Sequence, residues 1–276
     1  KAGSDRKFWR YIPVWTIKPM SLMSIPRSLQ SFMENKRAGF SPYLKYTIEG
    51  LVIFASVLFS FYVGNLNQTK ANYELKNTYL NDLIVTLDDD INQIQLVIDE
   101  LNESENKINL LQNDIEKRHL LLDDHKALSS AIQINIALSF FPKKGVFNQM
   151  ISTGTFELIA SDELKSNLLE IYNHLNERNY AISNEIDLWN MNFLDQMYLN
   201  FNIRAGYDMM NGEFYGKEKL LNYDFDKSFY LSKRFNGYLS RALIYSQQYK
   251  RLLSNFSEAY KKSKALATQE LSLDQK

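Results

Sequence analysis

The chain has 276 residues, 45% of them hydrophobic and 23% charged, and its 32 basic and 32 acidic side chains give a formal net charge of +0. It contains no cysteine, which excludes disulfides, thiol catalysis and cysteine metal sites. The charge is uneven: residues 1–45 hold nine Lys and Arg against two acidic residues, so they carry +7 and the remainder carries −7. An acidic remainder disfavours nucleic-acid binding.

Residues 1–41 are basic and rich in aromatic side chains. They cannot form one regular helix, because prolines interrupt the backbone hydrogen bonds at positions 13, 19 and 26. Trp9, Tyr11 and Trp15 stand among basic residues, a combination typical of the bilayer interface. We interpret these three side chains as interfacial anchors that dock on a membrane surface or on a partner. The alternative is a tail without regular structure.

Residues 42–64 are predicted to form a transmembrane helix, because residues 51–63 carry no charge and crossing a bilayer takes about 20 apolar residues. Ser41 can cap this helix, and Pro42 fits its first turn. The preceding basic residues place the N-terminus in the cytoplasm and residues 65–276 outside it. The apolar run begins after 40 residues and lacks a small-x-small cleavage site, so a secretory signal peptide is disfavoured.

Four positions of this helix are candidates for contacts with other helices. A carboxylate inside a membrane is costly unless it is paired, and Glu49 lies about two turns in, with Lys45 one turn before it. The alternative is that Glu49 reaches back to the cytoplasmic interface. Ser56, Ser60 and Gly64 form a small-xxx-small ladder, which permits a second helix to approach closely.

The helix is predicted to continue from residue 66 to about 127 as a heptad helix, because apolar residues recur at alternating three- and four-residue spacing. The seam consists of Leu80, Ile84, Leu87, Ile91, Ile94, Ile98, Leu101, Ile108, Ile115 and Leu122. Its distal half is expected to pack against later helices of the same chain, and the seam is also compatible with a homo-oligomer. His119, on the same seam, is interpreted as a core or register-setting polar residue, and Asp88-Asp89-Asp90 as a solvated face.

The rest of the chain is predicted to be helical as well. A turn is expected from Pro142, a left-handed helix cap at Gly154, and an N-cap at Ser161 for a helix that continues through Phe193. Residues 203–227 have no clear period and are interpreted as a loop, and a last helix follows from about residue 228 to about 271. The fold class is therefore all-α: one N-terminal transmembrane helix continues into the heptad helix, and residues 65–276 form an extracytoplasmic, periplasmic antiparallel helical bundle.

No site for chemistry is indicated. His119, His125 and His174 do not have the spacing of metal ligands, and the sequence contains no phosphate-binding loop, nucleophile elbow or dinucleotide fingerprint. We therefore expect no catalytic residues, no metal and no cofactor.

Two stretches resemble a known family. SPYLKYTIEGLVIFASVLFSFYVGNLNQ followed by YLNDLIVTLDDDI, and later FNQMISTGTFELIASDELKSNLLEIYN, are similar to the DUF6090 proteins, uncharacterised single-pass membrane proteins of Bacteroidetes. The order Glu49-Gly50, a Leu66 where the family usually has Trp, and the long N-terminal extension depart from the family pattern. The resemblance implies a bacterial envelope protein, and it brings no activity and no catalytic residues.

Two functional hypotheses follow. The first is a non-enzymatic structural or accessory subunit of a bacterial envelope complex, anchored in the inner membrane and contacting the lipid bilayer and other envelope proteins through helix–helix contacts. The second is an extracytoplasmic helical sensor that signals through a partner protein, since the cytoplasmic part holds no output domain. An envelope enzyme ranks third.

Overall fold

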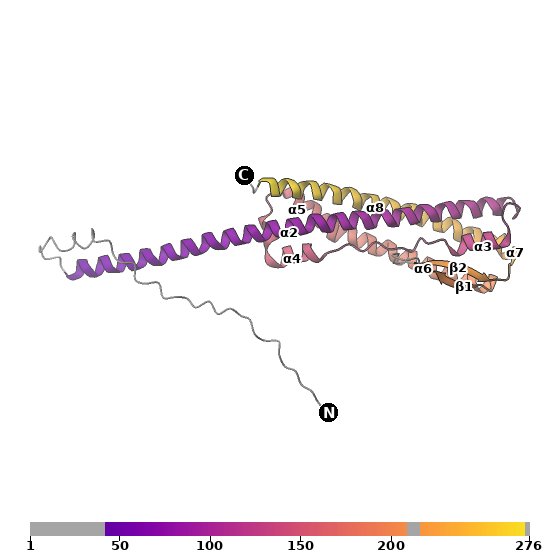
Figure 1. Ribbon diagram of the computed structural model, residues 1–276, viewed down its shortest axis with the longest axis horizontal. Helices are drawn as coiled ribbons and strands as arrows, with labels where there is room; N and C mark the ends of the chain where they lie inside the picture. Colours follow the sequence, from indigo (N-terminus) through magenta and orange to yellow (C-terminus); the bar gives the residue numbers. More distant parts are fainter. Residues whose placement is uncertain (1–41, 209–215, 274–276) are drawn as a thin grey trace, which may run out of the picture. The chain divides into compact units, whose positions relative to one another are not determined.

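A computed structural model describes residues 42–208 and 216–273 of the chain, which divides into two compact units, Lys1–Gly64 and Asn65–Lys276 (Figure 1). Helices make up most of the described residues, which confirms the prediction of a mainly helical protein. The interfacial anchors Trp9, Tyr11 and Trp15 lie outside the described residues.

The longest element is α2, which runs from Pro42 to Glu116. Its first part, residues 43–64, belongs to the first unit and is exposed at every position. The helix is long and apolar enough to cross a membrane: its most apolar 18-residue window has a mean hydropathy of 1.8, and none of that window is buried. The predicted apolar helix is therefore present.

The second part of α2, in the unit Asn65–Lys276, is buried along one side. Leu80, Leu87 and Leu101 are fully buried, and the half-buried seam residues such as Ile84 and Ile91 pack against the same core. A helix that is apolar on one stripe must bury that stripe against other elements, and here the core contains residues of α3 to α8. The heptad pattern therefore identified the buried face.

The end of α2 differs from the prediction. The helix stops at Glu116 instead of continuing to about residue 127. Arg118 and His119 then adopt left-handed backbone conformations, with φ of 60° and 61°, which no α-helix can contain. A separate short helix, α3 (Asp124–Ile132), follows with Asp123 as its N-cap. The heptad spacing continued across this break because buried residues of the loop and of α3 contact the same core.

The middle of the chain confirms both predicted caps. Gly154 ends α4 (Gly145–Thr153) in the left-handed conformation with φ of 74°, and the short 3₁₀ helix η1 (Thr155–Leu158) follows. Ser161 accepts a hydrogen bond from the Leu164 N–H and caps α5 (Asp162–Leu169). A π-helical stretch, η2 (Glu170–Leu175), joins α5 to α6 (Asn176–Phe201).

Two strands lie within residues 203–227, where a loop was predicted, and an all-α class is therefore wrong in this detail. Strands β1 (Arg204–Asp208) and β2 (Lys217–Asn222) pair antiparallel as a two-stranded sheet that contacts α3 (Figure 1). Neither strand alternates strictly between apolar and polar residues, since only its partner and α3 cover it. The periodicity that identifies a half-buried strand was therefore missing from the sequence.

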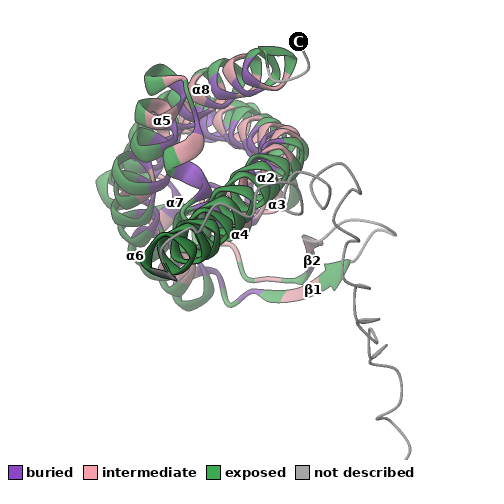
Figure 2. Cartoon of the chain, turned by 90° about the vertical axis from the view of Figure 1, so that its left-hand side faces the viewer, coloured by how far each residue is buried: buried purple, intermediate pink, exposed green. Residues whose placement is uncertain are grey.

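The predicted last helix is interrupted near its start. A short helix, α7 (Lys227–Tyr230), precedes α8 (Lys233–Leu273), and the Ser232 hydroxyl accepts a hydrogen bond from the Phe235 N–H. Hydrogen bonds from Lys76 to Glu270 and from Gln112 to Ser240 show that α8 runs antiparallel to the second part of α2. In Figure 2 the buried residues of α5, α6 and α8 face inward, and exposed residues cover their outer sides.

Candidate functional site

The four helix-contact candidates all lie on the exposed first part of α2. The hydroxyls of Ser56 and Ser60 donate to backbone carbonyls one turn earlier, of Val52 and Ser56, at 2.7 and 2.9 Å. A Cβ added at Gly64 would meet no atom within 4 Å. Glu49 is exposed, and no ion pair joins it to Lys45 within the part of the chain that the structure describes. Their role in helix contacts stays a prediction.

The acidic triplet Asp88-Asp89-Asp90 is not simply a solvated face. Asp88 pairs with Lys264 of α8 at 2.7 Å, and Asp89 pairs with Lys143 at 2.8 Å. Asp90 is fully buried, and its Oδ2 accepts a hydrogen bond from the Lys143 backbone N–H at 3.0 Å. Successive residues of a helix point in different directions, so only one of three neighbouring carboxylates reaches the core.

Asp90 lies beside two buried phenols. Its Oδ1 and the hydroxyls of Tyr172 and Tyr260 have no hydrogen-bond partner among the described residues. Burial raises the pKa of the Asp90 carboxyl, and the charge of Asp89 adds to this shift, although the backbone N–H and the charge of Lys143 oppose it. Burial, together with the charge of Asp90, also raises the pKa of both phenols. These three buried polar oxygens form a polar cluster inside the otherwise apolar core.

A second polar cluster closes the end of α2. The imidazole of His119 lies between two carboxylates, with Nδ1 2.6 Å from Asp114 and Nε2 2.8 Å from Asp124. Asp114 also accepts hydrogen bonds from the Tyr230 hydroxyl at 2.8 Å and from the backbone N–H groups of residues 121 and 122. Phe225 stacks on the imidazole with ring centroids 4.8 Å apart. His119 is thus a core polar residue, as predicted, but it belongs to a loop instead of a helical seam.

The electrostatics of this cluster favour a charged pair. Burial alone would lower the pKa of His119, but the hydrogen bonds and negative charges of Asp114 and Asp124 outweigh it and raise that pKa. Burial alone would raise the pKa of Asp114, but hydrogen bonds from His119, Tyr230 and the backbone lower it. Each nitrogen of the imidazole lies within hydrogen-bond distance of a carboxylate, so the cluster stabilises the loop.

A third buried polar group joins α2 to α8. The ammonium of Lys76 is 3.1 Å from Glu270, and both side chains are at most 3% exposed. The same carboxylate accepts hydrogen bonds from the backbone N–H groups of Ala160 and Ser161 at 2.7 and 3.1 Å, just before α5. Glu270 therefore ties three segments together.

A fourth polar group fixes the extended stretch before α4. The Tyr249 hydroxyl accepts a hydrogen bond from the Phe140 N–H at 2.8 Å, while the Asn179 amide donates to the Phe140 carbonyl at 2.8 Å. Tyr249 in turn donates to Asn179 at 3.0 Å. The two side chains satisfy both backbone groups of a residue that has no secondary-structure partner.

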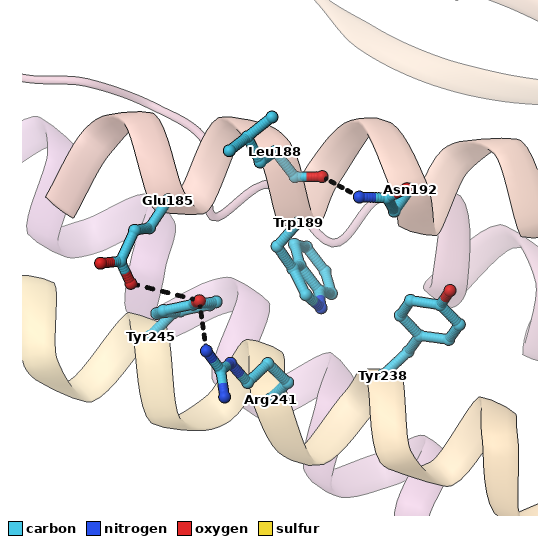
Figure 3. Close-up of a pocket in the computed structure, with 7 residues that line it drawn as sticks. All are labelled: Glu185, Leu188, Trp189, Asn192, Tyr238, Arg241 and Tyr245. Carbon is cyan, nitrogen blue, oxygen red and sulfur yellow. Dashed lines mark hydrogen bonds between the residues drawn. The ribbon is translucent and has the colours of Figure 1, made fainter. Parts of the chain in front are cut away.

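An open groove of the described surface lies between α6 and α8, and we call it the α6–α8 groove (Figure 3). It is open to solvent and has a volume of about 540 Å³, within the range of ligand pockets. The residues that line it are Glu185, Leu188, Trp189 and Asn192 of α6, and Tyr238, Arg241 and Tyr245 of α8.

The polar groups of the groove form a short chain. Arg241 donates a hydrogen bond to the Tyr245 hydroxyl at 2.7 Å, and that hydroxyl donates to Glu185 at 3.4 Å. Trp189 is only 7% exposed, and its indole Nε1 has no partner among the described residues. In Figure 3 this nitrogen points toward the α8 side of the groove, between Arg241 and Tyr238. The groove therefore presents one cation and one anion, while the indole Nε1 is buried.

Within residues 42–208 and 216–273 no group of three His, Cys, Asp or Glu side chains could hold a metal ion. The groove contains a carboxylate and a phenol but no activated nucleophile with a base beside it. The groove could not be predicted from the sequence, because its residues lie on two separate helices and look like ordinary helix-surface residues.

Comparison with known proteins adds no assignment: the chain matches no protein-family model, no curated protein and no solved structure. The resemblance to the DUF6090 proteins therefore stays a prediction.

Proposed function

We propose that this protein is a non-enzymatic accessory subunit of a bacterial envelope complex, anchored in the inner membrane by residues 42–64. The observation that carries the proposal is that the first part of α2 is apolar and exposed on all sides. A helix that is hydrophobic all round is stable only in a protein core or in lipid. The +7 charge of residues 1–45 places the N-terminus in the cytoplasm and the antiparallel helical bundle of residues 65–276 in the periplasm.

The bundle supports a scaffold role. Its buried polar groups, such as Glu270 and the pair Asp114–His119, join segments of the chain to one another and present no reactive atom to solvent. In the membrane, Ser56, Ser60 and Gly64 leave a small-residue face on which another helix, from a partner or from a second copy, can pack. The resemblance to the DUF6090 proteins agrees with an envelope location.

The test combines extraction, orientation and cross-linking in native membranes. The protein should resist alkaline carbonate extraction, external protease should cleave residues 65–276 in spheroplasts, and a cross-linker should capture a defined complex. Extraction by carbonate would contradict the anchor, and protection from external protease would contradict the orientation. A single uncrosslinked species at all cross-linker concentrations would contradict the subunit role.

The second candidate function is a sensor that works with a partner protein, and the α6–α8 groove favours it. Arg241 and Glu185 offer opposite charges at this groove. A screen of small zwitterionic and polar compounds by thermal shift of the full chain in detergent tests this candidate. A stabilising compound should lose its effect in Arg241→Ala, and a screen without any stabilising compound would contradict the sensor role.

A further inference from the structure

Helix α6 carries apolar side chains on two opposite sides. One side is buried in the core through residues such as Ile186, Trp189 and Phe193. The other side, which we call the outer face of α6, is solvent-exposed. It consists of Tyr180, Leu188, Met191, Tyr198 and Leu199, which are between 39% and 77% exposed.

Three side chains of the outer face lie in one row. Residues 180, 191 and 198 are separated by three and two helical turns and fall on one line along the helix, with Leu188 and Leu199 beside it. Single exposed apolar residues are ordinary in proteins, but a row of them on one face indicates an interaction surface.

From residue 179 onward the charged side chains of this helix are all acidic. From residue 179 to residue 203 the chain contains no Lys, Arg or His, but it contains Glu185, Asp187 and Asp195. Asp187 and Asp195 are eight residues apart and lie on the outer face, among its apolar side chains. A partner that covers this face must therefore bring apolar side chains and positive charge together.

We propose that the outer face of α6 docks an amphipathic helix of a partner protein, with apolar residues on one side and Lys or Arg beside them. This inference rests on the proposed accessory function and names the partner class of that function. Apolar side chains at helical spacing supply the affinity, and charge complementarity with Asp187 and Asp195 selects the partner. A second copy of this chain fits less well, because a two-fold contact would set this acidic face against itself.

The test uses the full chain in phosphatidylcholine nanodiscs and three labelled model helices of equal length. The first has a leucine stripe flanked by lysines, the second has the same residues in scrambled order, and the third has glutamates in place of the lysines. Binding is measured by fluorescence anisotropy against empty nanodiscs. The basic amphipathic helix should bind at least about tenfold more tightly than the other two. Equal binding of the scrambled helix would show mere charge attraction and overturn the proposal.

Two variants and a matched control locate the binding surface. Met191→Asn should weaken binding of the basic helix about tenfold or more, as expected for an interface anchor, and Asp195→Asn should weaken it less and reduce its salt dependence. Leu96→Asn is the control, since Leu96 is 68% and Met191 65% exposed. Circular dichroism confirms that each variant is folded. An equal loss of affinity in Leu96→Asn would overturn the assignment to α6.

Sedimentation of the same nanodisc samples separates the remaining outcomes. Self-association of the wild type that Met191→Asn abolishes would make the occupant a second copy, and the proposal would be wrong. Carbonate extraction of the protein from native membranes would contradict the membrane function and leave the peptide result standing. If the protein resists extraction but does not bind the basic helix, the docking proposal is wrong and the membrane function still stands.

Discussion

The two parts of α2 are one continuous helix in backbone conformation, but they differ in what surrounds them. Residues 43–64 are exposed on every side and apolar on every side. Residues 65–116 are apolar along one stripe, and that stripe is covered by the other helices of the second unit. A helix that is apolar along one stripe buries that stripe against other parts of the protein, whereas a helix that is apolar on every side is suited to lipid.

Polar residues show the same contrast. In the first part, the hydroxyls of Ser56 and Ser60 bond only to the backbone of their own helix. In the second part, Lys76, Asp90 and Asp114 bond to groups of other segments. In the first part of α2, where we expect lipid, the serine hydroxyls thus form hydrogen bonds within their own helix. In the second part, buried polar side chains form hydrogen bonds that join separate segments of the chain.

Charged substitutions in the first part of α2 should have the largest effect of the changes considered, and that effect is on membrane insertion. The double variant Phe54→Arg with Leu58→Arg should make membrane insertion less favourable by about 3 kcal/mol per arginine. The measurement is the fraction of protein that stays in membranes after carbonate extraction. The control is Leu96→Arg, which places the same charge on an exposed position of the second part and should leave extraction unchanged. Full retention of the double variant in membranes would contradict the lipid assignment.

Removing a buried carboxylate should have the second-largest effect, and that effect is on the free energy of unfolding. Glu270→Ala takes an acceptor from the buried Lys76 ammonium and from two backbone N–H groups, and it should lower the free energy of unfolding by about 3–5 kcal/mol. The control is Glu163→Ala, which breaks the exposed pair with Lys262 and should cost at most about 1 kcal/mol. Urea unfolding followed by circular dichroism measures both, and similar losses would refute the role of burial.

The heptad seam provides a test by cavity formation. Leu87 is fully buried, so Leu87→Ala should lower the free energy of unfolding by about 2–5 kcal/mol. Leu96→Ala changes a residue that is 68% exposed on the same helix and should change that energy by less than about 0.5 kcal/mol. The same urea titration measures both variants. If Leu87→Ala were as stable as Leu96→Ala, the heptad seam would not be part of the hydrophobic core.

The His119 cluster should produce the smallest effect, visible as a pH dependence. Because the folded protein raises the pKa of His119, its stabilisation is fully present below the unfolded pKa of about 6.5 and is lost as the pH rises through the folded value. Asp114 has the opposite sign: its contribution is present above an unfolded pKa of about 3.9 and is lost as the pH falls through its lowered folded value.

The measurement is the difference in unfolding midpoint between the wild type and His119→Asn across the neutral to alkaline range. This difference should shrink as the pH rises. The exposed His125 provides the control, and His125→Asn should follow the wild type at every pH. A difference that grows with pH would contradict a protonated imidazole in the folded state.

The local features of the fold could be predicted from the sequence. The apolar run, the seam from Leu80 to Ile115, the Gly154 cap and the Ser161 cap each depend on residues within one or two helical turns, and the structure contains all of them. The end of α2 could not be predicted from neighbouring residues. The left-handed turn at His119 is stabilised by Asp114 together with Tyr230, and Tyr230 lies 116 residues after Asp114 in the chain. The two strands were missed because neither has a strict alternation.

The α6–α8 groove and the outer face of α6 show the same limit. Tyr180, Leu188 and Met191 are as apolar as the buried stripe of α6, and apolar spacing does not say whether a second apolar side is covered. Asp90 and Asp89 are neighbours with the same side chain, yet only Asp90 is in the core.

The sequence by itself determined where helices form, which segment is apolar on every side, and that the charge differs in sign across that segment, because these properties depend on neighbouring residues. Only the tertiary structure decided which carboxylates are buried, where α2 ends and which side of α6 remains exposed. Those outcomes depend on contacts between residues such as Lys76 and Glu270, 194 positions apart, which no local pattern can encode.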